Sequence, residues 1–174
     1  MRLNATLLSL CVSLMLILIC LINFGAASAP ALTDNSLNVS ILSPHHWDNV
    51  TSTTIIEGTT DRAPKRGEEY IWIAVNPIKS PNDWWPQNGG PVKVFDGNFA
   101  APAYLGGTMN DTFTIVVLVV DSGLNIRLSE WLKNCKSANY FPPITKEDAI
   151  SNVTVSEDEI NDHIVKGIIV KLKG

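Results

Sequence analysis

The run TFTIVVLVV, residues Thr112–Val120, is the most hydrophobic stretch that follows the N-terminal region. Its β-branched residues are typical of a β-strand, in which successive side chains point to opposite faces. One face carries Phe113, Ile115, Val117 and Val119, and the other carries Val116, Leu118 and Val120. Because both faces are apolar, we expect an opposing sheet to cover one face and a helix to cover part of the other.

The segment that follows, residues 122–136, has helical rather than strand periodicity. Its apolar residues fall on a single stripe, which contains Leu124, Leu128, Trp131, Leu132 and Cys135. Asp121 or Ser122 can cap the start of such a helix, and Pro142-Pro143 prevents its continuation. We predict an amphipathic helix that folds back over the sheet, with Cys135 as a buried structural thiol rather than a reactive one.

Further strand-like runs precede and follow this pair. They cover residues 37–42, 53–57 (ended by Gly58), 70–76, 91–95, 98–104, 150–155 and 164–172. Asp96-Gly97 separates two of these runs and is a strong signal for a two-residue hairpin. About seven strands with turn signals between them predict a mainly β protein. We expect an antiparallel β-sandwich with one amphipathic helix inserted before the last strands.

Several short motifs occur along this β-rich part in a characteristic order. They are Ile41-Leu42-Ser43-Pro44, residues 53–58 and 70–77, Trp84-Trp85-Pro86-Gln87, Gly89-Gly90-Pro91-Val92, the strand at 113–120 and a helix ending in Trp131-Leu132. Over about residues 37–172 the series resembles immunoglobulin-like β-sandwich domains of exported bacterial and archaeal cell-envelope proteins. The polar piece at 156–163 departs from that pattern. The resemblance implies a structural or adhesive module and assigns no functional residue.

The N-terminal segment has the three parts of a secretory signal peptide. Arg2 precedes an uncharged apolar stretch at 7–22, and small residues follow at 25–29. An uncleaved membrane anchor is the alternative, because Pro30 follows the cleavage-type motif and a span needs about 20 apolar residues. We expect a signal or anchor over 1–29, a polar tether over 30–36 and the domain over 37–174, outside the cell or on its surface.

Composition restricts the partners and the chemistry. The net charge of −4, without a basic stripe, argues against nucleic acid as a partner. Two of the three cysteines lie in the signal segment, so the lone Cys135 cannot form a disulfide within the exported domain. Beyond the signal segment, four Asn-x-Ser/Thr sequons offer acceptor sites for N-glycosylation on an exported chain: Asn38, Asn49, Asn110 and Asn152.

The sequence contains no recognisable reactive constellation. Nucleophile-elbow, zinc-protease and phosphate-loop motifs are all missing. Adjacent residues such as His45-His46-Trp47-Asp48 rarely converge on one metal ion. The runs Glu68-Glu69 and Glu157-Asp158-Glu159 are typical of solvated charge and lack the spaced ligands that calcium prefers. We therefore predict a protein without catalytic residues, metal or cofactor.

The pair Trp84-Trp85 is the strongest candidate for ligand contact. Tryptophans on a secreted β-sandwich can stack on sugar rings, although such residues can equally close a core. In an extended chain the two side chains point to opposite faces, so one can be buried while the other is exposed. We predict a structural or interaction module that binds an envelope protein or a glycan. The alternative is a carbohydrate-binding module that uses Trp84 or Trp85.

Overall fold

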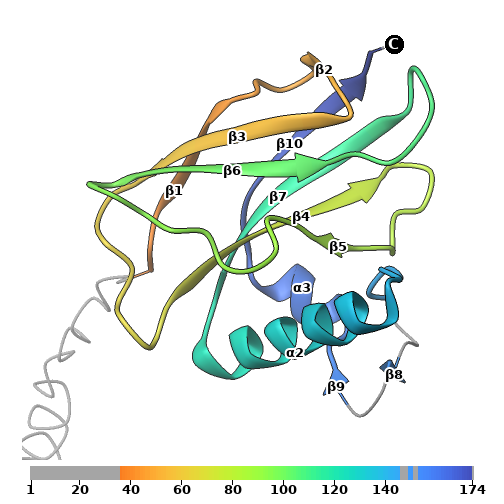
Figure 1. Cartoon of the computed structure of the whole chain (residues 1–174). Helices are drawn as coiled ribbons and strands as arrows, with labels where there is room; N and C mark the ends of the chain where they lie inside the picture. The colour runs from red at the N-terminus through yellow and green to blue at the C-terminus, as the bar shows by residue number, and fades with distance from the viewer. Residues whose placement is uncertain (1–35, 146–148, 151–152, 174) are drawn as a thin grey trace, which may run out of the picture. The chain divides into compact units, whose positions relative to one another are not determined.

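The computed structural model describes residues 36–145, 149–150 and 153–173. Its architecture is mainly β, with two sheets that face each other (Figure 1). Sheet A has the order β1-β3-β6 and contains β1 (Val39–Ser43), β3 (Thr53–Thr60) and β6 (Asn98–Tyr104). Sheet B has the order β2-β10-β7-β4-β5 and contains β2 (Asn49–Val50), β4 (Tyr70–Pro77), β5 (Trp85–Pro86), β7 (Thr112–Val120) and β10 (Ile164–Leu172).

Strand β7 supplies side chains to two separate cores, as its two apolar faces predict. Phe113, Ile115 and Val117 lie in the core between the sheets, which we call the inner core. Val116, Leu118 and Val120 lie in a second core on the opposite face of sheet B, which we call the outer core. The paired strand β4 is also buried along nearly its whole length. Its side chains alternate between the two cores in the same way.

The predicted helix is confirmed as α2 (Ser122–Ala138), which lies across the outer face of sheet B (Figure 1). Its buried residues are the five of the predicted stripe. The side chain of Asp121 caps the helix by accepting a hydrogen bond from the Leu124 N–H at 2.8 Å. The helix extends two residues beyond the predicted end at residue 136. Asn139 follows it as the C-cap, in a left-handed conformation.

The predicted hairpin at Asp96-Gly97 is confirmed, but the strand before it is not. Both turn residues have positive φ, 50° and 71°, and Phe95 and Asn98 exchange two backbone hydrogen bonds of 2.8 and 2.9 Å. Residues 91–95 otherwise contribute only a single bridge, from Val92 to Ile71. Pro91 lacks an N–H and follows two glycines with positive φ, so this segment does not continue a ladder.

Gly58 does not end a strand, contrary to the prediction. Strand β3 continues through it to Thr60, between β1 and β6. A Cβ at this position would lie 2.6 Å from Phe99 Cε1 and would also overlap the Ser40 carbonyl oxygen. Glycine is therefore present because the Phe99 ring packs directly on the backbone of β3, not because the chain turns.

The segment between α2 and β10 also differs from the prediction. Residues 150–155 do not form one strand, since β8 (Ala149–Ile150) and β9 (Val153–Thr154) pair as a short antiparallel hairpin. The polar piece at 156–163 contains a second helix, α3 (Glu157–Asp162). Ser156 and Glu159 form a capping box at its start, and this Ser-x-x-Glu spacing is a sequence signature of a helix N-terminus.

The N-terminal predictions fall outside this description. The signal or anchor at 1–29 and almost all of the tether at 30–36 lie outside the described residues. Within the part of the chain that the structure describes, no helix has the length and apolar character needed to cross a membrane.

Candidate functional site

The two neighbouring tryptophans separate to opposite sides of sheet B. Trp84 is only 5% exposed and packs in the outer core beneath α2, where its backbone pairs with Ile144. Trp85 is half-buried and packs against the inner core. Enclosed in this way, Trp84 has no ring face available to a ligand, whereas Trp85 borders a cavity.

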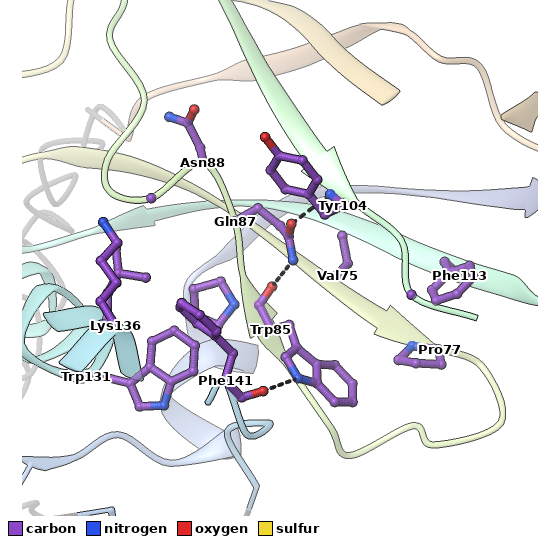
Figure 2. A pocket seen from close by; sticks show the side chains of 14 residues that line it. Val75, Pro77, Trp85, Gln87, Asn88, Tyr104, Phe113, Trp131, Lys136 and Phe141 are labelled. Atoms are coloured by element: carbon purple, nitrogen blue, oxygen red, sulfur yellow. Dashed lines mark hydrogen bonds between the residues drawn. The ribbon is translucent and has the colours of Figure 1, made fainter. Parts of the chain in front are cut away.

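The cavity next to Trp85 opens beside the short edge strand β5. We call it the side cavity; its volume is about 570 Å³ (Figure 2). Its walls are mostly apolar and aromatic, with principal contributions from Val75, Trp85, Tyr104, Phe113, Trp131 and Phe141. These side chains come from β4, β5, β6, β7, α2 and the loop that follows α2, so only the complete fold assembles the site.

The side cavity lies where the two cores meet. Of its lining residues, Val75 and Phe113 belong to the inner core, and Trp131 and Leu132 belong to the outer core. Strand β5 pairs with β4 through only two residues, so the ladder at that edge is short. The C-terminal part of α2 lines the cavity next to it and leaves apolar surface accessible from outside.

Gln87 fixes the two rims of the cavity to each other. It is 7% exposed, and its Oε1 accepts a hydrogen bond from the Tyr104 N–H of sheet A at 2.8 Å. Its Nε2 donates to the Trp85 carbonyl at 3.0 Å (Figure 2). The backbone N–H of Gln87 donates to the Ile73 carbonyl of β4 at 2.7 Å. Both ends of the amide are thus used to join the edge of sheet B to the edge of sheet A.

The loop after α2 forms the second wall. Its Phe141 carbonyl accepts a hydrogen bond from the Trp85 indole N–H at 3.2 Å, which sets the orientation of the Trp85 ring. The Phe141 ring meets Trp131 edge-on, with centroids 6.5 Å apart. Because Phe141 is 46% exposed and Tyr104 is 59% exposed, two aromatic rings remain accessible at the mouth.

Lys136, in the last turn of α2, is the one charged residue among the described residues that line the cavity. A Cβ placed on Gly89 would lie 3.7 Å from Lys136 Nζ, so the ammonium group sits against the loop at 88–90. Figure 2 shows this side chain extending along the α2 wall toward Asn88. Lys136 also borders a shallower hollow of about 380 Å³, which Lys133 lines as well.

A larger hollow, of about 950 Å³, is lined by residues of sheet A and by the loop at 88–91. Its lining includes Glu57, Lys93 and Asn98, which are exposed and polar, and the exposed Phe95. It is a broad open surface rather than an enclosed site. Ligand pockets are usually concave and mostly apolar, so the smaller side cavity fits the properties of a ligand site better.

The predicted sequons that fall within the described residues have the exposure that glycosylation requires. Asn38, Asn49 and Asn110 are exposed, although the Asn38 amide also donates a hydrogen bond to Asp61 at 2.9 Å. Asn152 lies outside the described residues. Occupancy of the four sites stays a prediction.

The two histidines of the segment 45–48 contact other residues of the fold. His46 Nδ1 accepts a hydrogen bond from the Ile169 N–H at 3.1 Å, and His45 lies 3.4 Å from the Asp48 carboxylate. Over residues 36–145, 149–150 and 153–173, no three His, Cys, Asp or Glu side chains gather as a metal site would need. Burial raises the pKa of the Cys135 thiol above its ordinary value, consistent with the structural role predicted for it.

Comparison with known proteins adds no assignment. No protein-family model matches this sequence, and no curated protein matches it. The interpretation of the side cavity therefore depends on its own geometry and chemistry.

Proposed function

We propose that residues 37–174 form a non-catalytic extracellular interaction module with immunoglobulin-like strand order, and that it binds its ligand in the side cavity. The observation that carries the binding proposal is the cavity itself. Well-packed interiors contain few voids larger than a water molecule, whereas ligand pockets usually measure about 300 to 1,000 Å³. At about 570 Å³ and lined by five aromatic side chains, the side cavity has the properties of a ligand pocket.

The strand order supports an immunoglobulin-like topology. In such domains one sheet contains strands A, B and E, and the other contains G, F and C, with C′ as an additional edge strand in the variable type. The order β1-β3-β6 corresponds to A-B-E, and β10-β7-β4-β5 corresponds to G-F-C-C′. On this interpretation α2, the β8–β9 hairpin and α3 replace the short F–G loop, and strand D has no counterpart among the described residues.

The extracellular location is inferred from the sequence. The apolar stretch after Arg2 and the small residues at 25–29 support export, and the exposed sequons are compatible with it. Either a cleaved signal or a retained anchor places the same domain on the outer side of the membrane.

Carbohydrate binding through Trp85 is the second candidate. The half-buried Trp85 ring and the exposed Tyr104 and Phe141 rings could stack on sugars. Sugars also require several hydrogen-bonding side chains, however, and the Gln87 amide already has protein partners at both ends. This arrangement favours an apolar ligand over a glycan.

A screen with four proteins tests the proposal. Wild type and the variants Trp85→Ala, Phe141→Ala and Trp47→Ala are compared by thermal shift against soluble glycans and against short-chain and medium-chain apolar compounds. Trp47 is the matched control, because it is 58% exposed and does not line the cavity. Circular dichroism checks that each variant is folded.

We expect at least one apolar class to stabilise wild type and Trp47→Ala, and to lose this effect in the two cavity variants. Binding that survives both cavity substitutions would contradict the proposal, as would the absence of any stabilising compound. Stabilisation by glycans alone, lost in Trp85→Ala, would favour the carbohydrate-binding alternative instead.

A further inference from the structure

The polar and apolar parts of the side cavity are arranged unequally, and this arrangement points to a class of ligand. We infer that the cavity binds a small amphiphile with an aliphatic chain and one terminal carboxylate, and that Lys136 binds the carboxylate. The inference rests on the proposed function and names the ligand of the same site.

The apolar walls of the cavity offer contacts to a hydrocarbon chain. Val75, Phe113, Trp131 and Leu132 are each less than 8% exposed and still face the cavity, so a ligand chain would contact the two cores directly. Each CH₂ group of a chain that is removed from water adds to the stability of the complex. A chain therefore gains more from these walls than a polar ring does.

The positive charge of the cavity is concentrated at one place on its rim. Of the described residues that line the side cavity, Lys136 alone is charged, and Lys133 adds a second positive charge in the adjoining hollow. Among the residues that the structure describes, no aspartate or glutamate lines the side cavity or that hollow. Among the described residues Lys136 forms no ion pair, so its ammonium group is available to a ligand anion.

The loop beside Lys136 allows a ligand to approach closely. Asn88, Gly89 and Gly90 all have positive φ, of 62°, 67° and 148°. The two glycines carry no side chain that would cover the ammonium group, and nothing lies within 4 Å of a Cβ placed on Gly90. A carboxylate at this rim would meet Lys136 while its chain extends toward Trp85 and Phe113.

Three probes that share a ten-carbon chain separate the contributions of chain and charge. Decanoate, decanol and decyltrimethylammonium, each kept below the concentration at which it forms micelles, are titrated into the purified protein by calorimetry. Because decanoate can form a hydrogen-bonded ion pair with Lys136 and decanol cannot, we expect decanoate to bind about tenfold more tightly than decanol. The cationic probe should bind most weakly of the three.

Substitution of two lysines identifies the residue involved. We expect Lys136→Gln to reduce decanoate affinity to that of decanol, without changing the affinity for decanol. Lys166→Gln is the matched control, because Lys166 is exposed on β10, which β7 and β4 separate from the edge strand β5 beside the cavity. This variant should bind the probes like wild type.

The outcomes distinguish this inference from the proposal beneath it. Equal affinity for all three probes, lost in Trp85→Ala, would overturn the carboxylate assignment and leave the cavity as a binding site. Unchanged decanoate affinity in Lys136→Gln would overturn the role of Lys136. Failure of every probe to bind, or binding that Trp85→Ala does not affect, would overturn both.

Discussion

Glu69 and Arg62 join the two ends of the loop between β3 and β4. The Arg62 guanidinium donates two hydrogen bonds, of 2.6 and 2.7 Å, to the Glu69 carboxylate, and the Lys65 N–H donates a third at 2.8 Å. The bond with Arg62 is the main reason that the pKa of Glu69 falls from 4.5 to about 2. The pair is mostly buried, with side chains 28% and 16% exposed for Arg62 and Glu69.

This lowered pKa predicts a pH-dependent contribution to stability. Because the folded-state pKa lies below the ordinary value, the contribution is complete above about pH 4.5 and is lost as the pH falls toward 2. We expect Glu69→Gln to lower the free energy of unfolding by about 1–2 kcal/mol at pH 7 and to have little effect near pH 2. Urea titrations at several pH values measure this, with the exposed Glu68→Gln as control. A difference that does not change with pH would contradict the prediction.

Gly58 is the residue at which β3 has the least space. A methyl group there would overlap the Phe99 ring and the backbone of β1, so Gly58→Ala should lower the free energy of unfolding by about 1–3 kcal/mol or more. Gly106→Ala is the control, because nothing lies within 4 Å of a Cβ at that position. Urea denaturation of both variants gives the comparison. Equal stability of the two would show that Phe99 does not pack against Gly58.

At the scale of elements, α2 is the largest addition to the two sheets. Its stripe contains Leu128, which is fully buried against sheet B, while Ile126 on the same helix is 56% exposed. We expect Leu128→Ala to lower the free energy of unfolding by about 2–5 kcal/mol and Ile126→Ala to change it by less than about 0.5 kcal/mol. Chemical denaturation followed by circular dichroism tests both, and similar losses in the two variants would contradict the placement of the helix.

The elements differ in how far sequence alone could predict them. Strand β7 and helix α2 were predictable, since both carry a long apolar pattern that identifies the element and its buried face. Residues 91–95 and 150–155 are short and rich in strand-forming residues, but whether such a segment pairs depends on a distant partner. Their β-propensity therefore overestimated the strands.

The candidate site was only partly predictable. Trp85 was identified from its residue type and its place beside a second tryptophan. Gln87, Tyr104, Lys136 and Phe141 were missed, because their roles come from contacts between residues that are 17 positions apart in one case and 56 in another. No local pattern distinguishes them from ordinary surface or core residues.

At the scale of the whole domain, the side cavity is where the inner and outer cores come together at an incompletely covered sheet edge. A ligand that fills it should stabilise the folded state, because it binds that state and not the unfolded chain. At a concentration of about 100 times its Kd, decanoate should raise the melting temperature by roughly 5–10 °C. Differential scanning calorimetry measures this shift, and Lys136→Gln should reduce it. An unchanged melting temperature would contradict ligand binding to the folded domain.

The location of the bound ligand can be observed by isotope-filtered nuclear Overhauser spectroscopy of the labelled protein with unlabelled decanoate. The side cavity predicts contacts from the methylene protons of the chain to the rings of Trp85, Phe113 and Trp131, which all line it. The exposed ring of Trp47, which does not line it, should show none. Contacts restricted to Trp47 or to other exposed residues, with no signal from the three cavity rings, would contradict the assignment of the side cavity as the binding site.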